Sequence, residues 1–363
     1  MGKKYKHLYS NIYSFENLYL ASRKSRQGKR RKLEVIKFEH LLEEHLFNIQ
    51  AQLKDETYQF GNYRKFIVTE PKERLIASAP YRDRVVHHAL CNLIEPILDK
   101  AMIFDSYACR INKGSHRAII KTQSFIKKYK YCLKFDIKKY FFTIDHEILI
   151  KDIQKKITDD KIIVLINKIL NTYTSKKEFY FPMNGDTLFD CLRPRGLPIG
   201  NLTSQLFANF YLTSLDRFIK NNLKIKAYIR YMDDGVLFSN CKAELQKIKN
   251  QISVFCEKKR LKLHQNKTQI FPVKNGLKYL GFHIYPNYCR ILRPNLIRFK
   301  HKFKLRCKQY ETGEIAWNNL LLSLNAWLGY VGVGRYKNII NLILSNIKFQ
   351  HPDNRRGEYG FII

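Results

Sequence analysis

The sequence predicts an α+β fold in which an antiparallel sheet is backed by helices on one face. An apolar run at 131–137 indicates a buried strand with Asp136 near its end. Two apolar strands at 227–238 flank an Asp-Gly pair, a strong hairpin signal. Helical patterns occupy 145–157, 206–215 and 244–259. The order strand, helix, helix, hairpin, helix, strand is typical of a ferredoxin-like split βαβ layer.

Length and charge define the broad class of protein. A chain of 363 residues corresponds to roughly two to three domains. Hydrophobic residues make up 45% of it and aromatic residues 13%, which excludes a disordered protein. Lys and Arg number 66 against 31 Asp and Glu, a net charge of +35. Such a surplus predicts a polyanionic partner, with nucleic acid first and an anionic membrane surface second.

Cysteine spacing and hydropathy indicate the compartment. None of the eight cysteines forms a CxxC pair, so we expect reduced, mostly buried thiols in a cytoplasmic protein. No apolar signal-peptide core follows the first basic residues. Residues 315–334 carry no charge over the length of a membrane span. Their asparagines, serine and glycines predict a buried helix and turn of a soluble protein, with no membrane contact.

Periodicity predicts further elements along the chain. Residues 57–79 alternate as β-structure, and Asp145 is the expected N-cap of the helix that follows it. Seven of the 11 residues at 22–32 are Lys or Arg, which fits either a flexible linker or an RNA phosphate contact. The other expected elements are helices at 8–20, 33–53 and 83–98, strands at 269–272 and 277–284, a basic helical region at 292–347 and a loose tail from 350.

Three carboxylates point to metal chemistry. Asp136 ends one predicted strand, and Asp233 and Asp234 lie in the predicted hairpin turn. If the strand and hairpin are neighbours, the three acids converge, and like charges so close require cations. Mg²⁺ is the expected ion because it prefers oxygen ligands. The alternative for an isolated Asp-Asp pair is ordinary turn chemistry.

Five motifs in order resemble those of reverse transcriptases. YMDD at 231–234 looks like the YxDD motif, and FDIKKYF at 135–141 resembles the first metal-binding motif. The others are RGLPIGNLTSQ at 195–205, LKL to KT at 261–268, and LKYLGF at 277–282, which is similar to the primer-grip hairpin. The resemblance implies a right-hand polymerase: a basic N-terminal extension at 1–32, fingers at 33–130, a palm at 131–286, a helical thumb at 287–349 and a loose tail at 350–363.

The resemblance also implies roles for the acids. Asp136 and Asp233 would hold two Mg²⁺ ions, for which Mn²⁺ can substitute. The backbone carbonyl of Ile137 would add a ligand, and Asp234 would lie near the primer terminus with a lesser metal role.

Other residues are expected around the substrates. Phe141 falls at the steric gate that excludes a 2′-hydroxyl, although core packing is its alternative. Lys72 and Arg74 would pair with the incoming triphosphate unless they lie on a solvated strand face, and Lys267 would support the pyrophosphate or donate a proton. His87, His88 and His146 are expected to be structural. The remaining candidates are nucleotide contacts at Ile199, Gly200 and Gln205, and template or primer contacts at Arg110, Lys113, Gly196, Pro198, Leu280 and Gly281.

Departures from the common pattern indicate a lineage. Most relatives carry Gln-Gly and Ser-Pro where this chain has Ile199-Gly200 and Ser204-Gln205. This pattern resembles the reverse transcriptases of diversity-generating retroelements, as do EPKER at 70–74, YRDRVVHHAL at 81–90 and LNAWLGY at 324–330. The family copies a template-repeat RNA into cDNA from dNTPs, with errors opposite template adenines, and works with a basic, helical, pentameric accessory variability protein.

Two alternatives stay open. One is a bacterial or phage-encoded reverse transcriptase of another lineage, such as a retron, group II intron or phage-defence type. The other is a non-catalytic RNA-binding protein on a polymerase fold.

Overall fold

The computed structural model describes residues 3–70, 72–175, 179–183, 185–333, 341, 344–345 and 347. The chain divides into two compact units. The first comprises 1–114 and 133–270, and the second comprises 115–132 and 271–363, so their border crosses two strands. In this division the hairpin at 277–284 groups with the C-terminal helices, and the fingers, palm and thumb limits stay a prediction. The predicted tail at 350–363 lies outside the described residues.

Helices dominate the N-terminal part of the first unit. Ser14 caps the second of them through its hydroxyl, which accepts a hydrogen bond from the amide of Asn17. The helix predicted at 33–53 is interrupted at Leu41, whose φ of −118° and ψ of 46° are not helical. The elements are α1 (Tyr9–Ile12), α2 (Phe15–Ser25), α3 (Leu33–His40), α4 (Leu42–Lys54) and α5 (Tyr81–Asp99).

The basic run at 22–32 is not a free linker at its start. Ser22 and Ser25 are buried in α2, and the guanidinium of Arg26 forms an ion pair with Glu39. The small side chains of these two serines let this end of α2 pack against α5. The number of basic residues in the run gave no sign of this packing.

The predicted β-structure at 57–79 is a two-stranded antiparallel hairpin. Strand β1 (Arg64–Val68) pairs with β2 (Arg74–Ser78), and Val68 lies opposite Arg74. All five residues of β1 are exposed.

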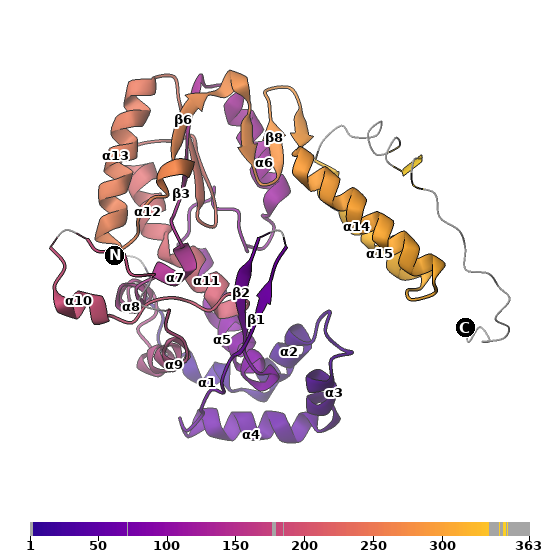
Figure 1. Cartoon of the computed structure of the whole chain (residues 1–363). Coiled ribbons are helices and arrows are strands. Elements are labelled where there is room, and N and C mark those ends of the chain that lie inside the picture. Colours follow the sequence, from indigo (N-terminus) through magenta and orange to yellow (C-terminus); the bar gives the residue numbers. More distant parts are fainter. Residues whose placement is uncertain are drawn as a thin grey trace. The chain divides into compact units, whose positions relative to one another are not determined.

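A four-stranded sheet carries the acidic residues (Figure 1). Its order is β4-β5-β3-β6, so strand β5 of the hairpin lies next to the strand that ends at Asp136. The α+β prediction is therefore confirmed. The strands are β3 (Tyr131–Asp136), β4 (Tyr228–Tyr231), β5 (Asp234–Ser239) and β6 (Gln269–Pro272).

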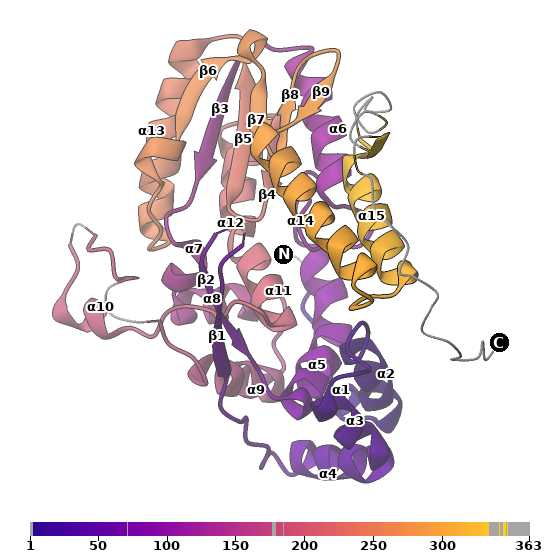
Figure 2. The same cartoon turned by 45° about the vertical axis from the view of Figure 1, so that its right-hand side comes forward.

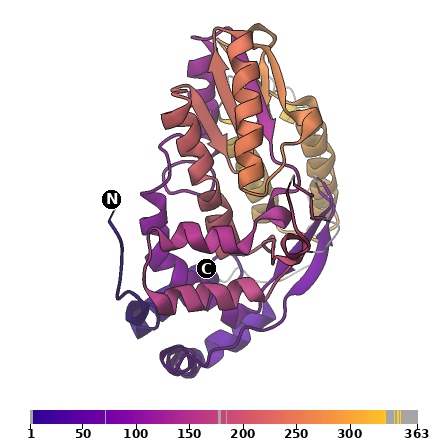
Figure 3. The same ribbon diagram turned by 90° about the vertical axis from the view of Figure 1, so that its left-hand side faces the viewer.

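Helices cover one face of this sheet. Helix α13 (Lys242–Lys258) packs on β5 and lies along the strands in Figures 2 and 3. Asp145 caps α8 (His146–Gln154) as predicted, because its carboxylate accepts a bond of 2.9 Å from the amide of Ile148. The remaining elements are α7 (Tyr140–Thr143), α9 (Asp160–Asn171), α10 (Leu188–Leu192), α11 (Leu202–Tyr211), α12 (Thr213–Arg217), the π-helix η2 (Phe218–Asn222) and the 3-10 turn η3 (Gln265–Lys267).

The second unit combines a small sheet with helices. The segment at 277–284 forms a tight hairpin, as its resemblance to the primer-grip hairpin implies, because Leu280 (φ 48°) and Gly281 (φ 89°) both turn left-handed. The elements are α6 (Ser115–Ile126), the 3-10 turn η4 (Val273–Asn275), β7 (Leu277–Tyr279), β8 (Phe282–Ile284), β9 (Cys289–Ile291), α14 (Arg293–Glu311) and α15 (Trp317–Val331).

The uncharged segment at 315–334 forms α15, but the prediction that it is buried is wrong. Of its residues only Leu320 and Val331 are buried, and Leu322 is 67% exposed. Its main partner in the second unit is the basic helix α14. The ring of Phe299 in α14 stacks on the ring of Trp327 in α15, with the ring centroids 3.8 Å apart. Among the described residues, no helix combines the length and hydropathy needed to cross a bilayer.

Candidate active site

The two acids of the hairpin occupy different positions in it. Tyr231 pairs with Asp234, so the two-residue turn is Met232-Asp233, and the Asp-Gly pair belongs to strand β5. The prediction that Asp-Gly forms the turn is therefore wrong. Met232 adopts a φ of 54°, a left-handed conformation that is uncommon outside glycine. The turn places Asp233 at the tip of the hairpin.

Gly235 lets β5 approach β3. A Cβ atom at this position would overlap the ring of Phe135, which is fully buried in β3. The side chain one residue after Phe135 is Asp136, and the one before Gly235 is Asp234. The close approach of the two strands therefore brings these carboxylates to the same end of the sheet, as the sequence predicted.

Asp136 is 7% exposed and is held from two sides. Its backbone carbonyl accepts a hydrogen bond of 2.7 Å from the amide of His264, and Ile137 forms an antiparallel bridge with Leu263. The ammonium of Lys267, at the end of the turn that follows, bonds the carboxylate of Asp136. The motif at 261–268 therefore delivers a cation to the first acid.

Repulsion and burial shape the electrostatics of the cluster. Burial, together with the negative charges of Asp136 and Asp234, raises the pKa of Asp233 from 3.8 to about 6. Burial also raises the pKa of Asp234, against the pull of Lys134, whose ammonium lies 3.8 Å from this carboxylate. The cluster therefore holds excess negative charge that favours a cation.

The donor set suits a hard divalent cation, which prefers oxygen ligands. The ammonium of Lys267 already supplies positive charge to Asp136. Over the ranges that the structure describes, however, no three His, Cys, Asp or Glu side chains are arranged around one metal position. Reverse transcriptases generally use divalent metal ions, and the charge of this site fits that requirement.

A buried arginine next to the Met232-Asp233 turn was missed by the sequence analysis. Arg230 in β4 is 0% exposed, and its guanidinium donates to both carboxylate oxygens of Asp216, at 2.7 and 2.6 Å. It also donates to the side-chain oxygen of Asn209 at 2.8 Å and to the carbonyl of Met232 at 2.9 Å. An arginine inside an otherwise apolar strand was the available signal, because a buried charge requires a partner. Arg230 thus ties the turn to α11 and α12.

The loop at 195–205 lies beside Phe141. The amide of Leu197 donates to the carbonyl of Phe141 at 2.7 Å, and the ring of Phe141 is half-buried. The amide of Ala77 in β2 donates to the carbonyl of Ile199 at 2.9 Å. The structure therefore joins the predicted nucleotide loop to the hairpin that carries the exposed residues Lys72 and Arg74.

Glycines shape this loop. Gly200 has a φ of 124°, and a Cβ there would meet the side chain of Ile76 at 2.9 Å. Gly196 has a φ of 95° and is buried, with a Cβ position 2.7 Å from that of Ser175. Pro198 is buried as well, whereas Gln205 on α11 is half-buried.

Arg110 is occupied by the protein itself. Its guanidinium pairs with Asp99 and donates to the carbonyls of Ile103 and Ser106, and its side chain is 9% exposed. In this arrangement it is not available to a template. The ammonium of Lys113 donates to the carbonyl of Phe104 at 2.8 Å in an exposed position. Leu280 and Gly281 belong to the second unit and form its hairpin turn.

The histidines fill structural positions. Burial lowers the pKa of His87 to about 3, and its ring lies 3.3 Å from the hydroxyl of Thr203. Burial lowers the pKa of His88 to about 4. His146 bonds the carbonyl of Gly196 at 2.7 Å, which supports the loop. All eight cysteines are free thiols, and five of them are buried.

Several known proteins are similar in sequence to this chain. Relatives include the group II intron-encoded protein LtrA of Lactococcus lactis subsp. cremoris, 23% identical over 73% of this chain and 53% of that protein. Protein YkfC of Escherichia coli is 25% identical over 58% of this chain and 62% of that protein. The putative COX1/OXI3 intron 1 protein of Saccharomyces cerevisiae is 26% identical over 50% of this chain and 21% of that protein. The chain thus spans from a fifth to three fifths of the length of these relatives.

The solved structure of apo telomerase from Candida tropicalis, truncated from its C-terminal domain, aligns with a TM-score of 0.45. It is 14% identical over 64% of this chain and 55% of that one. The family model described as "Reverse transcriptase (RNA-dependent DNA polymerase)" matches residues 67–284, more than half of the chain. This match covers the end of β1, all of β2, the four-stranded sheet and all three acids. The chain therefore belongs to the reverse transcriptase family of right-hand polymerases.

Proposed function

We propose that this protein is an RNA-directed DNA polymerase that copies an RNA template into cDNA from dNTPs. The observation that carries the proposal is the meeting of Asp136, Asp233 and Asp234 at one end of the sheet, with the pKa of Asp233 raised to about 6. Three crowded carboxylates serve a site that takes up cations. A non-catalytic RNA-binding protein would gain nothing from this repulsion.

Asp136 and Asp233 would hold two Mg²⁺ ions, with a smaller part for Asp234 and a contribution from the carbonyl of Ile137. The bound ions would activate the 3′-hydroxyl of the primer and stabilise the leaving pyrophosphate. Lys267 bonds Asp136 and so is placed to exchange this contact for a phosphate oxygen of the incoming nucleotide.

The surrounding side chains would select the nucleotide. The half-buried ring of Phe141 would lie under the sugar and exclude a 2′-hydroxyl. Lys72 and Arg74 are exposed cations on β2 and its preceding turn, and would offset the charge of the triphosphate. Gly196, Pro198, Gly200 and Gln205 would shape the template and nucleotide side of the loop. Lys113 would contact the template, and Leu280 and Gly281 would contact the primer.

We further propose the lineage of a diversity-generating retroelement, with a template-repeat RNA and an accessory variability protein as partners. The support is Ile199, which stands where most relatives have a glutamine. An isoleucine side chain offers no hydrogen bond to the incoming nucleotide, so the pocket would discriminate less by geometry. The group II intron-encoded relatives keep another lineage as the competing proposal.

Primer extension on an RNA template with Mg²⁺ and dNTPs tests both the polymerase activity and the lineage. We expect extension by the wild type and none by Asp233→Ala, whereas the control Asp55→Ala, at an exposed site after α4, should extend normally. Sequencing should show errors concentrated opposite template adenines. Uniform accuracy, with the native RNA and accessory protein present, would reject the diversity-generating lineage and keep the polymerase. Failure of the wild type under these conditions would reject the polymerase.

A further inference from the structure

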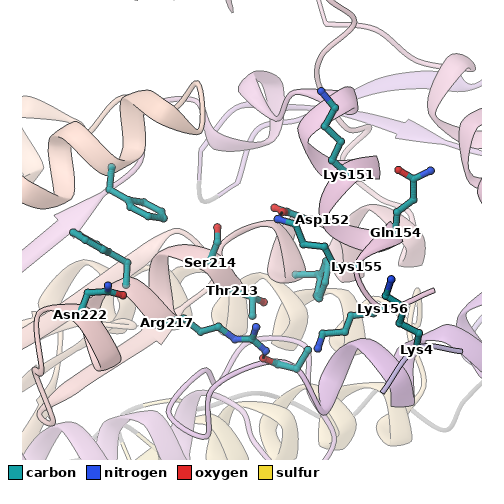
Figure 4. A pocket seen from close by; sticks show the side chains of 14 residues that line it. Lys4, Lys151, Asp152, Gln154, Lys155, Lys156, Thr213, Ser214, Arg217 and Asn222 are labelled. Atoms are coloured by element: carbon teal, nitrogen blue, oxygen red, sulfur yellow. Dashed lines mark hydrogen bonds and ion pairs between the residues drawn. The ribbon is translucent and has the colours of Figure 1, made fainter. Parts of the chain in front are cut away.

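The first unit contains a cavity of about 670 Å³ that the proposed polymerase activity does not use. Its walls come from α8, α12, η2 and α13 and from Lys4 near the N-terminus (Figure 4). None of the residues assigned to the active site lines it. Ligand pockets in proteins measure roughly 300–1,000 Å³, so the cavity has room for a nucleotide-sized molecule.

One wall of the cavity is strongly basic. Lys4, Lys151 and Lys156 line it, and their ammonium groups form no ion pair or hydrogen bond with the part of the chain that the structure describes. The acid present, Asp152, is already paired with Lys155 at 2.7 Å and with Lys259 at 2.6 Å. The free cations therefore remain available to an anion.

Two hydroxyl groups in the cavity wall lack partners. Thr213 is 5% exposed, and its buried Oγ1 has no hydrogen-bond partner among the residues that the structure describes; the same holds for the buried Oγ of Ser214. Figure 4 places both side chains between the lysines and Asn222. A buried hydroxyl that forms no bond costs free energy, which a polar ligand would recover.

Another part of the wall is aromatic. The rings of Phe218 and Phe255 stack with centroids 4.5 Å apart and planes 16° apart, and both rings are half-buried at the cavity. Phe218 begins the π-helix η2, a backbone form that is frequent at functional sites. Aromatic rings are the platforms on which nucleobases stack in single-stranded nucleic acid binding.

We propose that this cavity binds a nucleoside phosphate. The base would lie against Phe218 and Phe255, the phosphate would be held by Lys4, Lys151 and Lys156, and the hydroxyls of Thr213 and Ser214 would bond the base or sugar. The same chemistry is offered by a free nucleotide and by one nucleotide of a single-stranded RNA. With a net charge of +35, the chain is suited to either source.

Photocrosslinking of the full-length protein tests the proposal. One arm uses 8-azidoadenosine monophosphate, and the other uses a 12-nucleotide single-stranded RNA that carries 4-thiouridine. Mass spectrometry should locate the adduct at 213–222 or at Phe255. The double variant Lys151→Glu/Lys156→Glu should lose about tenfold or more of the labelling. The charge-matched control Lys247→Glu/Lys249→Glu, on α13 outside the cavity, should keep it.

The two arms separate the sources of the ligand. Labelling by the monophosphate alone identifies a free nucleotide, and labelling by the RNA that the monophosphate does not compete identifies a strand. Thr213→Val/Ser214→Ala, which removes the hydroxyls and keeps the charge, should weaken either by severalfold. Absence of an adduct at these residues in both arms, equal losses in the pocket and control variants, or displacement by polyglutamate instead of nucleotide would overturn the proposal. Primer extension reports on the polymerase independently of these outcomes.

Discussion

Asp233→Asn should stabilise the metal-free protein while it abolishes polymerisation. The folded state holds the proton of Asp233 more tightly than the unfolded state, because burial and the neighbouring acids raise its pKa from 3.8 to about 6. The folded protein therefore binds more protons between these values, and its stability falls as pH rises through this window. An amide at 233 removes that loss. The gain follows from the two pKa values as about 2 kcal/mol at pH 5 and about 3 kcal/mol at pH 7, an upper bound for a partly exposed group.

Urea denaturation in EDTA, from pH 5 to 8, measures this gain. The control is Asp55→Asn, an exposed aspartate at the end of α4, which should track the wild type. Addition of Mg²⁺ should stabilise the wild type and leave Asp233→Asn nearly unchanged. A variant less stable than the wild type in EDTA, or a difference that does not grow with pH, would refute the reasoning from repulsion.

Three other substitutions test the support of the site. Asp216→Asn strips the buried Arg230 of its carboxylate and should cost about 3–5 kcal/mol in urea denaturation, together with most of the activity; an unchanged unfolding midpoint would contradict the role of the pair. Gly235→Ala should cost about 1–3 kcal/mol by collision with the ring of Phe135, and the second change Phe135→Leu should restore part of it; no rescue would reject the steric explanation. Phe141→Ala should raise ribonucleotide incorporation at least tenfold in single-nucleotide extension with matched rNTP and dNTP, as expected from an open sugar pocket; unchanged selectivity would return this ring to core packing.

Local patterns were sufficient for much of the fold. The N-cap at Asp145, the hairpin at 227–238 and the helix at 242–258 all depend on neighbours within a few residues, which periodicity and capping chemistry describe. Predictions failed where a long-range partner decides. The break at Leu41 and the exposure of α15 depend on the tertiary packing around these two segments.

For the candidate site, too, the sequence predicted one part and the tertiary structure decided the other. The residue types and the order of the motifs identified the three acids and the family, because carboxylates for metals and cations for phosphates are chemical requirements written in the chain. The arrangement of these side chains in space could not be predicted from the sequence. The contact of Lys267 with Asp136 joins residues 131 positions apart in the sequence. The ion pair of Arg110 with Asp99 depends on the packing around the end of α5.

The sequence by itself therefore determined what kind of chemistry this protein can perform and which side chains are available for it. The tertiary structure alone decided which of those side chains meet, which are occupied and what supports them. Arg230 illustrates the reason: its partners Asp216, Asn209 and the carbonyl of Met232 come from three elements, and only the folded chain removes them all from water. The value of a buried charge depends on that shared environment, which no local pattern contains.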